Sequence, residues 1–331
     1  MTTINQNEEF DLFATLDPEE QAELGWEKTE ETIAATSIKK AKPVTKPATE
    51  VEPDEYPIDR VVFYAGHRMA VPSRTMKKEE VRAWLEETFP ELSKENTEMI
   101  YDEKTGHLVP VLKGHKKGAI DMRHETEPVA VSAKPLMVYP HHAEPGLPRF
   151  FRIDYTGRVE EVRDTQAGRF ILPLQSGMEA HLGATPVGGF IKKENLPWPS
   201  VDLLKEIVDR FVAEPEIEHL AYVVWDNDHY EVVWPRQIAN RVSVVGEGIV
   251  ETENRFIFLQ IHSHGRLDAF FSGTDDQDEV RTGLYGVIGN IGRGNLGNIP
   301  HASFRMSVGG RFNDLTIAPF QGDVEGVVFV R

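Results

Sequence analysis

A regular pattern of apolar and polar residues covers residues 57–118. Residues 60–71 contain two β-like runs, and a second pair of such runs flanks Glu103-Lys-Thr-Gly106, which is a hairpin signal. Between the two pairs, helical spacing of apolar residues predicts a helix over about residues 77–88 that Thr75 caps. Its apolar face consists of Val81, Trp84, Leu85 and Phe89. The order ββαββ predicts a small sheet wrapped over one helix.

The pattern is weaker in residues 119–195. Three short runs predict strands among turns, at residues 137–139, 149–155 and 169–174. We expect a β-rich lead-in region that packs on the domain that follows it. The pair His141-His142 invites a metal-binding interpretation, but adjacent strand residues point to opposite faces, so we expect this pair at the surface.

Residues 196–331 alternate between helical and β patterns. Ser200 can cap a helix that ends near Ala213 and whose Val201, Leu204, Val208 and Phe211 share one face. The runs 218–225 and 230–235 predict a hairpin. A second helix and five more strands are expected, the helix at about 274–282 and the strands at 241–245, 256–261, 284–288, 303–308 and 323–330. Helices that alternate with a mixed or antiparallel sheet predict an α/β sandwich.

The chain is acidic, and its first segment is the most acidic part. Asp and Glu outnumber Lys and Arg by 54 to 36, which gives a net charge of -18. Such a charge opposes binding to phosphates, so nucleic acid is not an expected partner. Residues 1–55 hold 14 acidic residues against 5 lysines and include a run rich in Pro, Thr and Ala. This composition buries little apolar surface, so we expect residues 1–56 to form a disordered tail and linker.

Cysteine is absent from all 331 residues. Its absence excludes a disulfide framework, thiolate zinc ligands and a cysteine nucleophile. The N-terminus lacks the order of a signal peptide, and no apolar run approaches the ~20 residues that span a bilayer. We therefore expect a soluble, cytoplasmic protein without a membrane partner.

The candidate metal ligands begin near the end of a predicted strand. His262 and His264 are two positions apart, so both imidazoles point to one face of the strand. Two imidazoles suit zinc, and without cysteine the third ligand must be a carboxylate. Asp275 lies where a loop enters a helix, three residues after Ser272, and can turn back toward the strand end. Two histidines, one aspartate and a water would complete a tetrahedral zinc site with one open position.

The same residues match the motif of the JAMM/MPN metallopeptidases, which is H-S-H, seven residues, then S-x-x-D. Every position matches, at His262, His264, Ser272 and Asp275. The resemblance implies a metallopeptidase domain over 196–331 with the α/β sandwich of that family, which is cytidine deaminase-like. It also implies three zinc ligands, His262, His264 and Asp275, and an oxyanion role for Ser272, whose alternative or additional role is to cap the helix.

The family also requires a glutamate at the start of an early strand. Glu218 stands there, and Glu216, two residues before it on the same strand face, is the competing candidate. Where the family usually has a glycine, this chain has Ala221. The resemblance implies that Glu218 is the catalytic general base and acid, which takes a proton from the zinc-activated water and returns it to the leaving amine.

Two longer runs resemble proteins of bacterial and plasmid PRTRC systems. HSHGRLDAFFSGTDDQDEVRTGLYGVIGNI is similar to PRTRC-system protein A, a JAMM-type family, and this likeness covers about residues 135–331. VFYAGHRMAVPSRTMKKEEVRAWLEETFPELSKENTEM, with the later LVPVLKGHKKG, is similar to the ubiquitin-like PRTRC-system protein C. The ββαββ order is also the β-grasp arrangement of ubiquitin-like modules. We therefore expect a ubiquitin-like β-grasp domain over 57–118, fused upstream of a peptidase.

These resemblances imply a zinc-dependent peptidase or isopeptidase that processes or deconjugates a ubiquitin-like protein in a bacterial conjugation-like system. The expected partners are a ubiquitin-like protein, either the chain's own β-grasp module or a separate one, and E1-like and E2-like proteins. The alternative is a non-catalytic metal-binding scaffold of a bacterial or plasmid-encoded complex.

The segment after the last β-grasp strand contains a candidate cleavage site. Gly118 is followed by the small residue Ala119, and glycine has no side chain to obstruct entry into a peptidase cleft. The hypothesis is that the Gly118–Ala119 bond is cut. The alternative is a flexible linker that leaves the module as a permanent docking domain.

Overall fold

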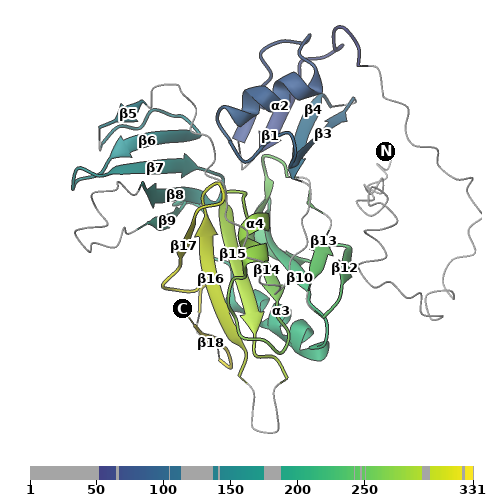
Figure 1. Cartoon of the computed structure of the whole chain (residues 1–331), viewed down its shortest axis with the longest axis vertical. Coiled ribbons are helices and arrows are strands. Elements are labelled where there is room, and N and C mark those ends of the chain that lie inside the picture. The colour runs from purple at the N-terminus through teal and green to yellow at the C-terminus, as the bar shows by residue number, and fades with distance from the viewer. Residues whose placement is uncertain are drawn as a thin grey trace, which may run out of the picture.

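The computed structural model describes residues 52–64, 67–103, 105–112, 137–140, 142–174, 188–241, 243–246, 248–249, 251–292, 299–322 and 325–330. The predicted disordered tail lies almost entirely outside these ranges, and so do His141 and the bond between Gly118 and Ala119. The described part of the chain is a mixed α+β structure in which several sheets dominate and helices are few (Figure 1). No helix among the described residues is both long and apolar enough to cross a membrane.

The N-terminal module has the predicted order of two strands, a helix and two strands. Its elements are β1 (Val61–Tyr64), β2 (His67–Ala70), α2 (Lys78–Glu86), β3 (Thr97–Asp102) and β4 (His107–Leu112). The sheet order is β2-β1-β4-β3, in which β1 and β4 run parallel and the outer pairs are antiparallel. The buried core consists of Val62, Tyr64, Val81, Leu85, Phe89, Leu92 and Leu108. The helix therefore buries its predicted apolar face on the sheet.

The expected cap of α2 was wrong. The N-cap residue is Lys77, whose backbone N–H donates to the Glu80 carboxylate at 2.7 Å. The hydroxyl of Thr75 instead lies 2.8 Å from the hydroxyl of Ser73. The Glu80 carboxylate, three residues after the N-cap, accepts the otherwise free backbone N–H of Lys77. The helix dipole also favours a negative charge at this end of the helix.

The lead-in region forms a five-stranded sheet in sequential order. Its strands are β5 (Val138–Tyr139), β6 (Arg149–Ile153), β7 (Val159–Asp164), β8 (Gly168–Pro173) and β9 (Gly189–Lys192). The three predicted strands are confirmed, whereas β7 and β9 were not predicted. Ala167, Phe170 and Leu172 belong to the same buried cluster as the core of the C-terminal part, so this sheet packs on it as expected. His142 is exposed.

The C-terminal part is built on a seven-stranded sheet. Its strands are β10 (Leu220–Asp226), β11 (His229–Val233), β14 (Arg255–Ser263), β15 (Gly283–Gly289), β16 (His301–Ser307), β17 (Phe312–Asp314) and β18 (Val328–Phe329). The order is β11-β10-β14-β15-β16-β17, and β18 pairs with β16. The β14–β15 and β16–β18 pairs are parallel and the other pairs are antiparallel. A small ribbon of β12 (Gln237–Ala239) and β13 (Val244–Gly246) completes this part.

Helix α3 (Val201–Ala213) has the predicted bounds and cap. The side chain of Ser200 accepts a hydrogen bond from the backbone N–H of Asp202. The inward face consists of Leu204, Ile207, Val208 and Phe211, which share one core with residues of β8, β10, β14, β15 and β16. The amphipathic pattern of the sequence is thus satisfied by burial against the sheet.

Three expectations for this part need correction. The helix expected to reach residue 282 is the short α4 (Gly273–Asp278), which ends where Glu279 leaves the helical backbone conformation. The strand expected over 323–330 is described only as β18, and the strands β12 and β17 were not predicted. The parallel β14–β15 pair requires a crossover connection, and this connection contains α4. The crossover places α4 at the end of β14, where the predicted site lies (Figure 1).

Candidate metal centre

The two histidines lie at the carboxyl end of β14, in the middle of the main sheet. His262 pairs with Leu220 of β10 on one side and with Val287 of β15 on the other. The backbone N–H of His264 donates to the carbonyl of Ile288 at 2.8 Å, which holds the chain in line beyond the last strand residue. The Nε2 atoms of the two imidazoles lie 3.2 Å apart, and both side chains are buried. The predicted histidine pair therefore converges on one point.

The glycine after the histidines is required by its surroundings. Gly265 has a φ of +52°, in the left-handed region that residues with a Cβ rarely adopt. A Cβ at this position would lie 2.6 Å from the carbonyl oxygen of Pro215. The chain can therefore turn away from β14 immediately after His264 only because this residue is glycine.

Asp275 reaches the same point from α4, as predicted. Its Oδ1 lies 3.1 Å from His262 Nε2, and its Oδ2 lies 3.6 Å from His264 Nε2. The carboxylate is fully buried. One ligand atom from each of the three residues lies within 4.8 Å of the others, so the group could hold a metal ion.

Ser272 caps α4 and holds the Asp275 carboxylate. Its backbone N–H and its hydroxyl each donate to Asp275 Oδ2 at 2.7 Å, and its Oγ accepts from the Asp275 N–H at 3.2 Å. This reciprocal capping box starts the helix at the required place. In this structure the Ser272 hydroxyl therefore orients the carboxylate of Asp275.

The donor set fits a metal ion of the zinc type. Two imidazole nitrogens face one carboxylate, and zinc binds such nitrogen and oxygen atoms in catalytic sites with three protein ligands. An ionised carboxylate without solvent contact is normally paired with a cation or coordinates a metal. Asp275 is in this situation, with the two imidazoles as its close neighbours.

The two glutamate candidates lie in very different environments. His219 and Ser263 are linked in both directions, from His219 N–H to Ser263 Oγ and from Ser263 N–H to the His219 carbonyl, each at 2.9 Å. The paired register of β10 and β14 begins at Leu220 and His262, so Glu218 lies two residues before the start of β10, at the histidine end of β14, and Glu218 is fully buried. Ala221 lies buried in the core.

Glu216 lies at the surface instead. Its carboxylate accepts a hydrogen bond from Arg266 Nε at 2.8 Å and lies 3.7 Å from Arg241 Nη2. The hydrogen bond from Arg266 lowers the pKa of the Glu216 carboxyl. Of the two candidates, Glu218 is the buried one, at the histidine end of β14, and Glu216 takes part in a surface ion pair.

Sequence reasoning missed Glu279 and Arg305. Glu279 is fully buried, and its Oε1 lies 3.9 Å from His262 Nδ1, the ring nitrogen that faces away from the ligand cluster. Arg305 of β16 donates from Nε to Glu279 Oε2 at 2.9 Å and pairs with Asp276 at 2.5 Å. The Arg305 guanidinium also lies over two aromatic rings, 3.9 Å from the centroid of Phe271 and 3.8 Å from that of Phe312.

A signal for Glu279 was present in the sequence. It follows Asp275 by four residues, and side chains four apart lie on the same face of a helix. A carboxylate at the second ring nitrogen orients a metal-ligating histidine and raises its basicity.

An aromatic side chain covers the imidazoles on the outside. The ring of Phe270 lies edge-on to that of His264, with centroids 4.9 Å apart, and Phe270 is 44% exposed whereas His264 is 1% exposed. Leu267, in the same crossover, is also exposed. The cluster therefore lies directly beneath an apolar surface that solvent reaches.

Neither a scan against protein-family models nor a search of curated proteins returns a match for this chain. Function therefore has to be inferred from the sequence motif and the geometry of the site.

Proposed function

We propose that the chain is a zinc-dependent peptidase or isopeptidase of the JAMM/MPN type that acts on a ubiquitin-like protein. The single observation that carries the proposal is the buried convergence of His262, His264 and Asp275, with the buried Glu218 two residues before the Leu220–His262 pair. The spacing of these residues is that of the JAMM/MPN motif. The seven-stranded sheet with α3 packed on it and α4 in the crossover is in keeping with the α/β sandwich of that family.

The proposed mechanism assigns a role to each side chain. His262, His264 and Asp275 hold the zinc ion, which when bound supplies Lewis-acid activation of water near neutral pH. Glu218 accepts the proton of the attacking water and returns it to the leaving amine. Ser272 keeps Asp275 in position in the resting site, and its hydroxyl donates to the oxyanion that forms during attack.

The substrate class follows from the N-terminal module. The sheet order β2-β1-β4-β3 with a parallel central pair and one packed helix supports a β-grasp module over 57–118. A ubiquitin-like module fused to a peptidase points to a ubiquitin-like protein as substrate, with E1-like and E2-like proteins as further partners. The bond between Gly118 and Ala119 is the proposed cut within this chain.

A second candidate function is a non-catalytic scaffold in which the metal only stabilises the fold. The nearly complete burial of His262, His264, Asp275 and Glu218 favours it, because structural zinc sites are closed. Structural sites, however, use four protein ligands, whereas the cluster found among the described residues offers three. The missing fourth protein ligand therefore favours the catalytic site.

A matched pair of variants tests the proposal. Glu218→Gln and Glu216→Gln should both keep about one zinc per chain, because neither residue is a ligand. Only Glu218→Gln should abolish hydrolysis of a peptide bond placed after a ubiquitin-like protein. Mass spectrometry of the substrate measures this hydrolysis. An active Glu218→Gln variant with an inactive Glu216→Gln variant would show that the base was assigned to the wrong residue. Zinc binding without hydrolysis by the unmutated protein would support the scaffold.

A further inference from the structure

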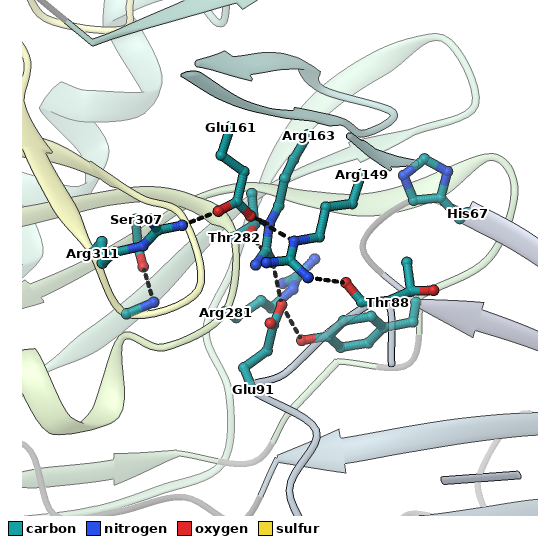
Figure 2. Close-up of polar contacts among 12 residues, drawn as sticks. His67, Thr88, Glu91, Arg149, Glu161, Arg163, Arg281, Thr282, Ser307 and Arg311 are labelled. Atoms are coloured by element: carbon teal, nitrogen blue, oxygen red, sulfur yellow. Dashed lines mark hydrogen bonds and ion pairs between the residues drawn. The ribbon is translucent and has the colours of Figure 1, made fainter. Parts of the chain in front are cut away.

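A buried charged cluster joins the three parts of the described chain. We call Glu91, Glu161, Arg163 and Thr282 the junction cluster. Glu91 follows α2 in the N-terminal module, Glu161 and Arg163 lie on β7, and Thr282 immediately precedes β15 of the main sheet. All four residues are less than 9% exposed. Figure 2 shows their side chains pointing toward one another from three different parts of the chain.

One guanidinium group connects all members of the junction cluster. Arg163 Nη1 donates to Glu91 Oε1 at 2.7 Å and to Thr282 Oγ1 at 2.8 Å, and Arg163 Nε donates to Glu161 Oε1 at 2.8 Å (Figure 2). The Arg163 side chain is 3% exposed, and that of Glu91 is 1% exposed. The contact between the N-terminal module and the rest of the chain therefore contains a charge pair without solvent contact.

Two further arginines pair with the junction cluster. Glu161 also accepts from Arg149 Nε at 2.8 Å and from Arg311 Nη2, so that carboxylate serves three guanidinium groups. Glu91 is the carboxylate that the N-terminal module contributes to Arg163. Its second partner, the Tyr64 hydroxyl at 3.4 Å, belongs to the module itself.

Further contacts lie around this pair. The His67 ring of β2 is hydrogen-bonded through Nε2 to the carbonyl of Asp164 at the end of β7, and Arg149 donates to the carbonyl of Thr88 at 3.5 Å. The backbone also fits closely, because a Cβ on Gly309 would lie 2.6 Å from the Arg163 guanidinium and 3.4 Å from Glu91 Oε2. The module thus meets the other two parts through several specific contacts.

We propose that β7 and Thr282 form a docking surface for the chain's own β-grasp module. Glu91 holds the module on this surface, and the module stays bound when the connecting chain is cut. Glu91 and Arg163 are both buried in the docked arrangement, and losing one partner of such a pair would leave the other charge buried and unpaired, which is strongly unfavourable. A cut between Gly118 and Ala119 would then not release the module. On the proposed function, any ubiquitin-like protein that the metal site sets free would therefore be a separate molecule.

The test cuts the chain without using its own activity. A recognition sequence for an unrelated site-specific protease is inserted between Gly118 and Ala119 of the full chain, and the cut protein is passed over a size-exclusion column at micromolar concentration. The two fragments should elute together. Their separate elution would overturn the proposal. Because neither zinc nor Glu218 takes part in this cut, the result does not depend on whether the peptidase proposal is correct.

Variants show whether the buried pair holds the module. Glu91→Gln should weaken the affinity between the fragments on the order of 100-fold, whereas Glu95→Gln, at an exposed site four residues later, should leave it unchanged. Arg163→Met should weaken the affinity to a similar extent, and the double variant should be no weaker than either single variant. Strictly additive losses, or an unchanged affinity for Glu91→Gln, would contradict the role of the pair. Circular dichroism of the uncut variants confirms that the module is folded.

Discussion

Single side chains decide how well His262 is held. The Asp275 carboxylate lies beside Nε2 of the ring, and the Glu279 carboxylate lies on the side of Nδ1. Glu279 is in turn paired with the buried Arg305. The Glu279 carboxylate therefore lies between the His262 imidazole and the Arg305 guanidinium.

The first prediction concerns Glu279. Glu279→Gln should lower the zinc affinity by about 10–100-fold, because outer partners of metal-ligating histidines typically contribute that much. Asp276→Asn is the matched control, since Asp276 is the other carboxylate bonded to Arg305 and its side chain is 50% exposed. The measurement is a competition titration with a chelator, and the absorption spectrum of the cobalt-substituted protein reports the ligand geometry. Equal affinities for the two variants would show that Glu279 serves only to neutralise Arg305.

The second prediction concerns the pH dependence of stability. Burial by itself would raise the pKa of Glu161, but the charges of Arg163, Arg149 and Arg311 hold it at about 2, below its usual 4.5. A carboxyl whose pKa is lower in the folded protein stabilises the fold above pH 4.5, and this contribution is lost as the pH falls toward 2. The free energy of unfolding, measured by urea titration, should therefore decrease over this range.

A pair of variants isolates this contribution. Glu161→Gln should cost about 3–5 kcal/mol at neutral pH, because three arginines lose their shared carboxylate, and should flatten the pH dependence. Glu98→Gln, at an exposed site, should leave the pH dependence of the free energy of unfolding as it is in the unmutated protein. An unaltered acid slope in Glu161→Gln would refute the assignment.

Much of the site was predictable from residue spacing. His262 and His264 lie at alternate positions of a strand and Asp275 starts a helix, so local geometry alone brings their side chains together. Glu218 was harder to assign, because Glu216 lies two residues before it on the same predicted strand face. Only the folded structure shows that Glu218 is buried whereas Glu216 pairs with Arg266 at the surface. Arg305 lies 26 residues beyond Glu279, so its contact depends on the pairing of β15 with β16.

Among the elements, helix α3 shows the match between pattern and structure most clearly. Val208 and Val212 lie one turn apart, yet Val208 is 7% exposed and Val212 is 46% exposed. The helix therefore offers two identical side chains in opposite environments.

The third prediction uses this pair. Val208→Ala should lower the free energy of unfolding by about 2 kcal/mol, because it removes buried methyl groups and leaves a small cavity. Val212→Ala should change it by less than about 0.5 kcal/mol, as expected for an exposed substitution. Equal losses, measured by urea unfolding, would mean that α3 does not pack on the sheet through the face described.

Strand β7 shows why some elements were not predicted. Its sequence, Val-Glu-Glu-Val-Arg-Asp, resembles a solvated charged segment, but four consecutive residues of this strand are buried. The burial is possible because Glu161 and Arg163 are neutralised by partners from other parts of the chain. Likewise, α4 ends early, and the nearby Thr282 bonds to Arg163, which lies 119 residues away in the sequence. Local patterns contain no information on such distant partners.

For the molecule as a whole, the metal should act as a ligand of the folded state. The cluster of His262, His264 and Asp275 joins β14 to the crossover helix, so an ion there ties two elements of the C-terminal part together. A ligand that binds only the folded chain stabilises it by about 2.7 kcal/mol at a concentration of 100 times its Kd.

The fourth prediction is that removing zinc with a chelator lowers the Tm of the unmutated protein by several degrees, as measured by calorimetry. The His262→Ala/His264→Ala double variant should show the same Tm with and without the chelator. Replacement of the exposed His142 by alanine should leave the chelator effect intact. A chelator effect that persists in the double variant would place the ion elsewhere.

The docking of the N-terminal module on the other two parts was beyond prediction from sequence. The ββαββ order of the module was predictable from local periodicity, and so was most of the strand sequence of the main sheet. The junction, however, depends on hydrogen bonds between residues 72, 119 and 150 positions apart, and these form only in the assembled molecule. Charged residues that are buried in such contacts look like surface residues in the sequence.

The position of the ligands within one crossover has a consequence for the order of folding events. All three lie between positions 262 and 275, so the loop that an ion closes is short and its closure costs little entropy. The docking of Glu91 on Arg163 closes a much longer loop, of 72 positions. Pairings distant in sequence form slowly, so a refolding chain can capture its ion in the nascent C-terminal part before the module arrives. An ion bound there would act as a nucleus of assembly as well as a constituent of the finished site.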